Sequence, residues 1–221
     1  MSEQQPDPTS LFARLVWGRD DALHLDEACL LVSAHARPGL DVGTALGTLD
    51  RLAEGIDSFA AWHARLFTES GFAGDAEDYH AAENSLLDRV LARRRGMPIT
   101  LAVVGIEVAR RAGVPMAGIG MPGHFLLRHT GEPAWFVDPF AGGELLDAAG
   151  CEALFRKIAD PGVPFRPDYL APVTNRQIVG RILANLRNTY ATAGDGANLA
   201  WVLRLQLLLP DPALTERSRF N

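Results

Sequence analysis

The sequence has few cysteines and no long hydrophobic run. Its two cysteines, Cys29 and Cys151, lie far apart without Cys-x-x-Cys spacing, which argues against a disulfide framework and a structural zinc site. No segment approaches the roughly 18 consecutive apolar residues of a membrane-spanning helix, and the acidic start over residues 1–8 is unlike a secretory signal. We therefore expect a soluble, cytoplasmic protein whose cysteines are small buried hydrophobic residues.

The sequence also lacks an excess of positive charge. The formal net charge is −6 and the isoelectric point is near 5.5, whereas binding to a nucleic-acid backbone requires a concentrated basic face. One basic cluster remains, formed by residues 93–95 with Arg110 and Arg111, and we expect it to be a solvated face. Neither nucleic acid nor a membrane is expected as a partner.

The chain of 221 residues falls in the range of one large domain, or one domain with an appendage, and can bury a core without disulfides or metals. Residues 1–9 are predicted to form a flexible arm. Apolar residues then recur near helical spacing in three segments, 23–31, 41–53 and 59–71. The first third is therefore predicted to be wholly helical.

The middle of the chain changes to a mixed pattern. Pro98 suits the first position of a helix over residues 99–112, because its missing N–H would be unsatisfied there in any case. This helix is apolar on nearly every side, as expected of a helix in the core. Three extended segments follow, 116–121, 124–129 and 134–138, and the turn residues between them predict an antiparallel meander.

The last part of the chain returns to helices. A short strand near Leu145 precedes a helix over 147–159, and after a proline-rich connector the segments 178–190 and 200–209 resemble one unit of a helical repeat. The predicted fold class is α+β, with a helical N-terminal part, a central helix packed on a small antiparallel sheet, and a C-terminal helical hairpin.

His124 and Asp138 are the candidate catalytic residues. A cysteine nucleophile acts as a thiolate at a helix start, a histidine takes its proton, and a carboxylate orients the imidazole. The chain supplies this order of elements, and the separation of fourteen positions from His124 to Asp138 allows adjacent antiparallel strands. The helix start, however, reads Gly96-Met97-Pro98 and holds no cysteine.

These motifs resemble the core of the transglutaminase-like superfamily of papain-type folds. The motifs are GMPITLA, RAGVP, His124 and VDP, at residues 96–102, 111–115, 124 and 137–139. The sequence is more similar to the SirB-type bacterial branch, and that resemblance covers residues 20–210. It is carried by NS, RGMPIT, PGHF, DPFAGG and RILANL, at 84–85, 95–100, 122–125, 138–143 and 181–186.

The resemblance implies a transglutaminase-like domain over residues 10–172 and a tetratricopeptide-like helical tail over 173–221. In active members of the superfamily, the position that matches Pro98 is the nucleophilic cysteine of a Gly-x-Cys motif. The SirB-type branch has Gly-x-Pro-Ile there, so the departure belongs to the branch, and peptidase or transglutaminase activity does not follow from the resemblance.

Several residues could carry the missing chemistry. Thr100 is a weak candidate for a substitute nucleophile, and its simpler interpretation is local capping or packing in the first turn. Cys29 and Cys151 could reach the site only by accident of the fold. The His124–Asp138 pair could bind a ligand, act as a general base on water, or be a structural couple.

Five further residues are candidates for ligand contacts. Asn84 and Ser85 suit a helix cap, and the resemblance places them near the cleft. Arg128, four residues after His124, is expected to share its strand face and could bind a carboxylate. Gly142 and Gly143 either turn the chain or allow a ligand close to the backbone.

No metal or cofactor is expected. His124 and Asp138, even with His80, His129 or Glu144, do not form a metal-binding motif.

Two functional hypotheses remain. The first is a pseudoenzyme, a binding or regulatory module whose papain-like cleft binds a protein, a peptide or a small molecule. The alternative is a hydrolase or acyl-transfer enzyme that uses His124 and Asp138 with water or Thr100. A homodimer is conceivable because an isolated helical hairpin leaves apolar faces uncovered.

Overall fold

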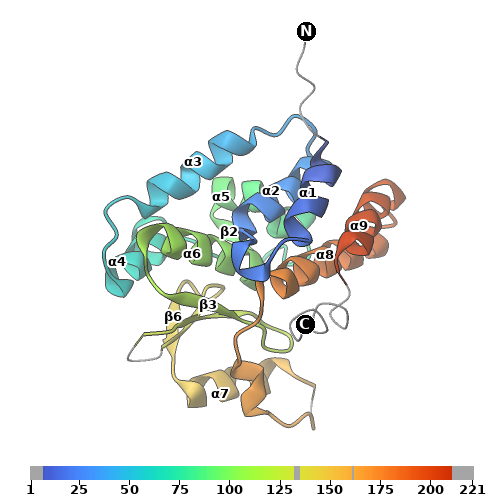
Figure 1. Ribbon diagram of the computed structural model, residues 1–221. Helices are drawn as coiled ribbons and strands as arrows, with labels where there is room; N and C mark the ends of the chain where they lie inside the picture. Colours follow the sequence, from blue (N-terminus) through green and yellow to red (C-terminus); the bar gives the residue numbers. More distant parts are fainter. Residues whose placement is uncertain (1–6, 132–134, 161, 211–221) are drawn as a thin grey trace, which may run out of the picture.

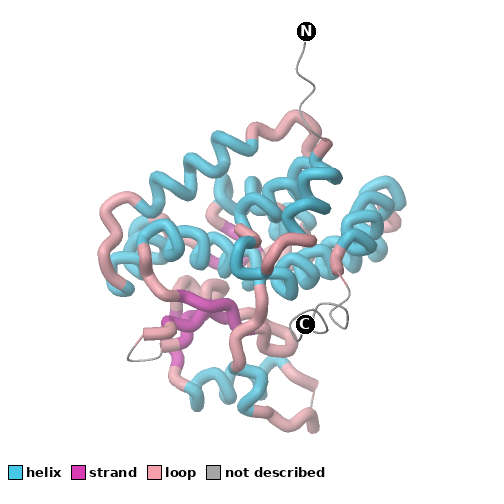
Figure 2. Tube along the Cα trace, in the orientation of Figure 1, coloured by secondary structure: helices cyan, strands magenta, loops and turns pink. Residues whose placement is uncertain are grey.

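A computed structural model describes residues 7–131, 135–160 and 162–210 (Figure 1). Its helices are α1 (Pro8–Val16), α2 (Leu25–Ala36), α3 (Val42–Ala53), α4 (Phe59–His63), α5 (Leu87–Arg93), α6 (Pro98–Ala112), α7 (Ala148–Ile158), α8 (Asn175–Thr192) and α9 (Gly196–Leu208). The strands are β1 (Ala73–Gly74), β2 (Arg95–Gly96), β3 (Met116–Ile119), β4 (Leu126–His129), β5 (Phe136–Asp138) and β6 (Glu144–Leu146). Figure 2 shows most helices on one side of a small sheet and a shorter helical region on the other, which confirms the α+β class.

The N-terminal third is helical, as predicted, but two details differ. The predicted flexible arm, 1–9, falls largely on residues 1–6, which lie outside the described residues, while Pro8 and Thr9 already belong to α1. The helix predicted over 59–71 is α4 followed by a π-helical segment, η2 (Ala64–Glu69). No helix in the described part of the chain has the length and apolar character needed to cross a membrane.

The predicted meander is confirmed. The strands pair antiparallel in the order β3-β4-β5-β6, and the sheet lies between α6 on one side and α7 on the other (Figure 1). Side chains alternate between the two sides: Leu127 and Val137 join the main core with α6, while Leu126 and Phe136 pack in a second cluster with Cys151 of α7. The sheet therefore separates a large core from a small one.

The predicted strand start at His124 is wrong, because β4 begins at Leu126. Pro122 and Gly123 form a tight turn in which Gly123 has a positive φ of 76°, and the His124 N–H donates to the Met121 carbonyl at 3.1 Å. This turn uses backbone groups that a strand would pair with its neighbour. His124 therefore precedes the sheet.

The C-terminal hairpin packs on the rest of the molecule. A capping box joins the Thr174 and Gln177 side chains to the backbone at the start of α8. Ile178, Ile182 and Leu186 of α8 are buried in the same core as α6, and α9 lies against α8. The tetratricopeptide-like character of the tail stays a prediction, and residues 211–221 lie outside the described part.

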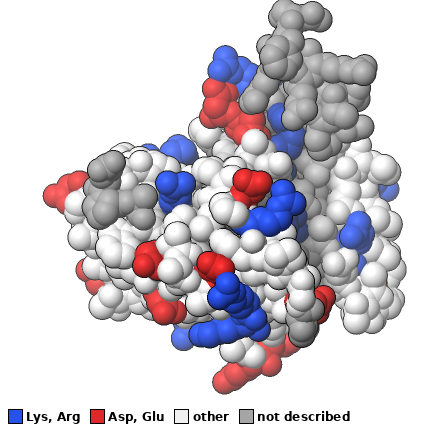
Figure 3. Space-filling view, turned by 90° about the horizontal axis from the view of Figure 1, so that it is seen from below, with Lys and Arg blue, Asp and Glu red and all other residues white. Residues whose placement is uncertain are grey.

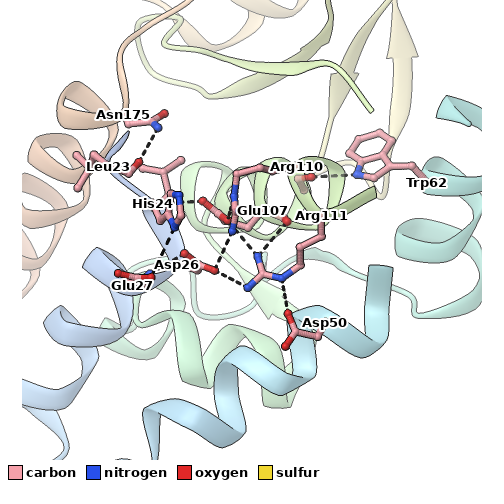
Figure 4. A network of polar contacts seen from close by, with 12 residues as sticks. Leu23, His24, Asp26, Glu27, Asp50, Trp62, Glu107, Arg110, Arg111 and Asn175 are labelled. Carbon is pink, nitrogen blue, oxygen red and sulfur yellow. Dashed lines mark hydrogen bonds and ion pairs between the residues drawn. The ribbon is translucent and has the colours of Figure 1, made fainter. Parts of the chain in front are cut away.

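The basic cluster is exposed at residues 93–95 and at Arg110, as expected, with Arg111 half-buried, and its arginines are also paired. Arg111 binds Asp26 at 2.6 Å, Asp50 at 2.7 Å and Glu107 at 3.1 Å, so it ties α6 to α2 and α3 (Figure 4). Burial raises the pKa of Glu107, and Arg110 opposes this shift.

The three consecutive arginines are also bound to the chain itself. Arg93 forms an ion pair with Asp75, while Arg94 and Arg95 donate to carbonyls in residues 70–71. These contacts anchor the segment that leads into β1. On the face shown in Figure 3, acidic and basic side chains are interspersed.

Candidate functional site

The structure brings His124 and Asp138 together. His124 Nε2 lies 2.9 Å from Asp138 Oδ1, and both side chains are buried. The same carboxylate oxygen accepts the backbone N–H groups of Phe140 at 2.9 Å and Ala141 at 3.2 Å. An ionised carboxylate only accepts, so this network assigns the proton of a neutral imidazole to Nε2 and leaves the lone pair on Nδ1. The catalytic role of the pair stays a prediction.

The turn after β5 fixes the carboxylate. Asp138 ends the strand, and its carbonyl accepts the Gly143 N–H at 2.9 Å. Gly142 and Gly143 have positive φ angles of 66° and 89°, which glycine adopts readily. A Cβ on Gly143 would collide with the Phe67 ring, and its carbonyl contacts His63 Nε2 at 2.6 Å. Neither glycine lines the cavity described below, so their predicted ligand contact is not supported by placement.

Pro98 occupies the first position of α6, as predicted. Met97 precedes it, and the Met97 N–H donates to the Asn84 carbonyl at 3.0 Å. The strand β2 pairs in parallel with β1 just before this point, so the helix start is anchored on two sides. Pro98 lines the same cavity as His124, and its ring has no nucleophilic atom.

The candidate substitute nucleophiles, Thr100, Cys29 and Cys151, do not line the cavity that contains His124 and Pro98. Thr100 is completely buried, and its hydroxyl has no hydrogen-bond partner among the described residues. Cys29 and Cys151 are also buried, and burial raises the pKa of both thiols, that of Cys151 to about 12. A thiol becomes reactive when its pKa is lowered, so this environment gives neither cysteine a nucleophilic role.

A cavity of about 600 Å³ adjoins the dyad. Its wall is formed by Tyr79 and His80, by residues 97–99 at the start of α6, by residues 123–125, and by one face of α8. This volume lies within the usual range of small-molecule sites. The cavity therefore joins the imidazole, a buried helix start and α8 in one space.

Arg181 is the cation of this cavity. One of its terminal nitrogens donates to the carbonyls of Met121 at 3.1 Å and His124 at 2.8 Å, and its guanidinium lies 5.5 Å from the centre of the Phe125 ring. Burial lowers the pKa of Arg181, while the nearby Tyr79 acts in the opposite direction. Arg181 thus fixes the turn that presents His124.

Asn84 and Ser85 support the cavity without lining it. The prediction that Asn84 or Ser85 caps a helix is wrong. The N-cap residue of α5 is Leu86, and α5 has no side-chain capping bond among the described residues. Instead the buried Asn84 amide donates to the carbonyls of Asp78 at 2.7 Å and Tyr79 at 3.4 Å. The Ser85 hydroxyl contacts the Met97 sulfur at 3.0 Å. These contacts hold the Tyr79 loop and the start of α6, so both residues position the wall.

The Arg128 side chain does not reach the cavity. Its guanidinium lies 5.5 Å from the centre of the Phe136 ring, on the α7 side of the sheet, and it is not a cavity residue. Its Nε has no partner among the described residues.

His129 packs against Phe59, with ring centroids 4.7 Å apart. Within the described ranges, no group of three or more His, Cys, Asp or Glu residues could hold a metal ion.

One wall of the cavity, the α8 face, was not predicted from the sequence. Arg181, Asn185, Asn188 and Thr192 recur at intervals of four, three and four residues, which places them on one side of a helix. This polar stripe is visible in the sequence. Its proximity to His124 depends on long-range packing of α8 against the main core.

Comparison with known proteins agrees with this geometry. The family model described as transglutaminase-like superfamily matches residues 32–184. A UPF0162 protein of Xylella fastidiosa is 35% identical over 187 residues, 78% of this chain and 66% of the relative. The chain therefore spans just under two thirds of that relative.

More distant relatives match shorter parts. Protein SirB1 of Salmonella typhimurium is 26% identical over 129 residues, 57% of this chain and 47% of SirB1. Human F-box only protein 21 is 35% identical over 98 residues, 40% of this chain and 16% of the relative. No solved structure matches the chain. From the family match and these relatives, the chain belongs to the transglutaminase-like superfamily and is of the SirB-type bacterial kind.

Proposed function

We propose that this protein is a non-catalytic binding module, in which the cavity beside His124 holds a small molecule or a short peptide segment. The observation that carries the proposal is Pro98, which lines the cavity beside a well-formed His124–Asp138 pair. A proline ring cannot form an acyl intermediate, whereas the imidazole remains available as a hydrogen-bonding group.

The cavity beside the dyad has walls that suit ligand binding. These walls offer apolar surface from Ile99 and Phe125 together with amide and hydroxyl groups of α8. Small-molecule sites combine such apolar walls with a few convergent polar groups. The anchored start of α6 and the Tyr79 loop would present these groups in a fixed arrangement.

The direct test is a binding screen of metabolites and short peptides, read by thermal shift and by the NMR signals of the His124 ring. Wild type should bind a member of the screen, and His124→Ala should weaken that binding by about tenfold, the loss of roughly one strong hydrogen bond. His24→Ala is the matched control, because His24 lies at the start of α2 and is not a cavity residue. Equal binding by His124→Ala would contradict the proposal.

One observation favours a second candidate, general-base hydrolysis. The Asp138 hydrogen bond to Nε2 leaves the Nδ1 lone pair free to accept a proton from water, without a protein nucleophile. Bound compounds should then be converted to hydrolysis products, detected by mass spectrometry, with turnover lost in His124→Ala and retained in Thr100→Val. Recovery of every bound compound unchanged would eliminate this candidate.

A further inference from the structure

The cavity contains a positive charge that no carboxylate of the described residues neutralises. Arg93, Arg110 and Arg111 each form ion pairs, but Arg181 has no ion-pair partner within the described ranges and donates to two backbone carbonyls. A partly buried charge without a counter-charge is unfavourable unless a ligand or solvent compensates it. This arrangement suits an anionic ligand.

The neighbouring acidic group does not serve as that counter-charge. Asp138 Oδ1 already accepts three N–H groups, from His124, Phe140 and Ala141. Tyr79, which also lines the cavity, is half-buried, and burial raises the pKa of its hydroxyl. A neutral tyrosine hydroxyl can donate a hydrogen bond to an anion.

The start of α6 adds a second feature that favours an anion. The helix extends over 15 residues from Pro98, and its N-cap residue, Met97, provides no side-chain capping bond among the described residues. The first N–H groups of a helix have no partner within the helix, and its dipole places partial positive charge there. Met97, Pro98 and Ile99 all line the same cavity as Arg181. Pro98 has no N–H and the Met97 N–H donates to the Asn84 carbonyl, so Ile99 offers the free N–H among these three described residues.

We propose, on the basis of the binding function above, that the cavity recognises its ligand through a carboxylate, held between Arg181 and the first turn of α6. Arg181 Nη2 already donates to the Met121 and His124 carbonyls, so the Nε and Nη1 groups remain to donate to the carboxylate. One carboxylate oxygen can accept the Ile99 N–H at the same time. The amides of Asn185 and Asn188 lie farther along the same face of α8 and contact the rest of the ligand.

The test uses the full chain and four sets of probes, with binding measured by calorimetry. The sets are short neutral peptides with a free C-terminal carboxylate, the same peptides amidated, amidated peptides with one Asp or Glu, and inorganic phosphate. Free-acid peptides should bind at least about tenfold more tightly than their amides, because one charge-assisted hydrogen bond is lost. Preference for the acidic side chain over the terminus would keep the proposal and identify the source of the carboxylate.

Variants locate the site. Arg181→Gln should reduce binding of the carboxylate peptides by about tenfold or more, and Arg181→Lys should retain part of it. Arg204→Gln is the matched control, because it removes one exposed arginine from α9 away from the cavity. If Arg181→Gln fails to fold, judged by thermal unfolding, the comparison of free-acid and amidated peptides on wild type still decides.

The outcomes separate the two proposals. Equal binding of free-acid and amidated peptides, lost in His124→Ala, would overturn the carboxylate and retain the binding function. Tighter binding of phosphate than of any carboxylate would also overturn the carboxylate. Absence of binding by every probe and by the wider screen would overturn both.

Discussion

Pro98 changes the chemistry of the site while it preserves the local backbone. Proline at the first helical position has no N–H to leave unsatisfied, and its fixed φ suits the helix. The residues around it remain anchored by the Met97 N–H and by the His124–Asp138 hydrogen bond. A proline at this position therefore offers no nucleophilic atom and leaves the surrounding cavity intact.

The buried hydroxyl of Thr100, two residues after Pro98, can be tested by substitution. Its hydroxyl is buried and has no partner among the described residues, so Thr100→Val should leave the free energy of unfolding unchanged or raise it by up to about 1 kcal/mol. Urea denaturation measures this. Thr100→Ser is the control, because it keeps the hydroxyl and loses a methyl group, which should destabilise by about 1 kcal/mol. A clearly destabilised valine variant would mean that the hydroxyl has a partner.

At the scale of elements, the contact between α6 and the sheet depends on one glycine. A Cβ on Gly105 would lie 2.7 Å from Leu127 and 3.2 Å from Trp62, whose indole N–H donates to the Gly105 carbonyl at 2.9 Å (Figure 4). The close approach of α6 to β4 leaves no room for a methyl group. Packing against the sheet thus outweighs the weak helix propensity of glycine here.

Gly105→Ala should therefore lower the free energy of unfolding by about 1–2 kcal/mol, since overpacking outweighs the gain in helix propensity. Gly47→Ala in α3 is the matched control, because its Cβ would meet only the end of the flexible Arg51 side chain at 3.5 Å. That variant should gain about 0.5–1 kcal/mol. Urea denaturation of both proteins measures the difference, and equal stabilisation of the two would refute the tight contact.

The elements that the sequence predicts well are those fixed by local chemistry. Pro98 and Gly113 mark the two ends of α6, and the turn residues after it predict the meander. The order of helix start, His124 and Asp138 also predicted their proximity correctly. The helix ends and the turns depend on residues that are close in sequence. The His124–Asp138 contact depends on the pairing of β4 with β5, although His124 itself precedes β4.

The features that the sequence predicts poorly depend on irregular local turns or on contacts between distant segments. Asn84 suits a cap by residue type, yet its amide binds the Tyr79 loop instead. Arg128 was expected to share a strand face with His124. The turn at Gly123 makes the strand begin at Leu126 instead, so His124 lies outside it. Arg181 reaches the site because α8 packs on the main core. Such contacts become visible only when the segments are folded together.

At the scale of the whole molecule, the sheet divides the apolar interior into two unequal parts. The main core combines the N-terminal helices, α6 and α8, and it includes Cys29. The second cluster lies between the sheet and α7, is much smaller, and includes Cys151 and Phe155. Regions with few buried apolar contacts open at a lower free energy than the global core.

The two thiols can report on this difference. Cys151→Ala leaves only Cys29, and Cys29→Ala leaves only Cys151. The labelling rate of each single-cysteine variant therefore reports the opening of one core. Both thiols are buried with raised pKa values, and labelling by a disulfide reagent at pH 8 should therefore require an opening event. We expect Cys151 to react faster than Cys29, with a smaller dependence of its rate on low concentrations of urea.

The urea dependence of the labelling rate distinguishes local opening from global unfolding, because it scales with the surface that the opening exposes. Labelling of Cys29 should require global unfolding and show the full dependence, whereas separation of α7 from the sheet exposes less surface. Equal rates and equal urea dependence at the two cysteines would show that both cores unfold as one cooperative unit. Rapid labelling of either native variant without urea would contradict the burial of that thiol.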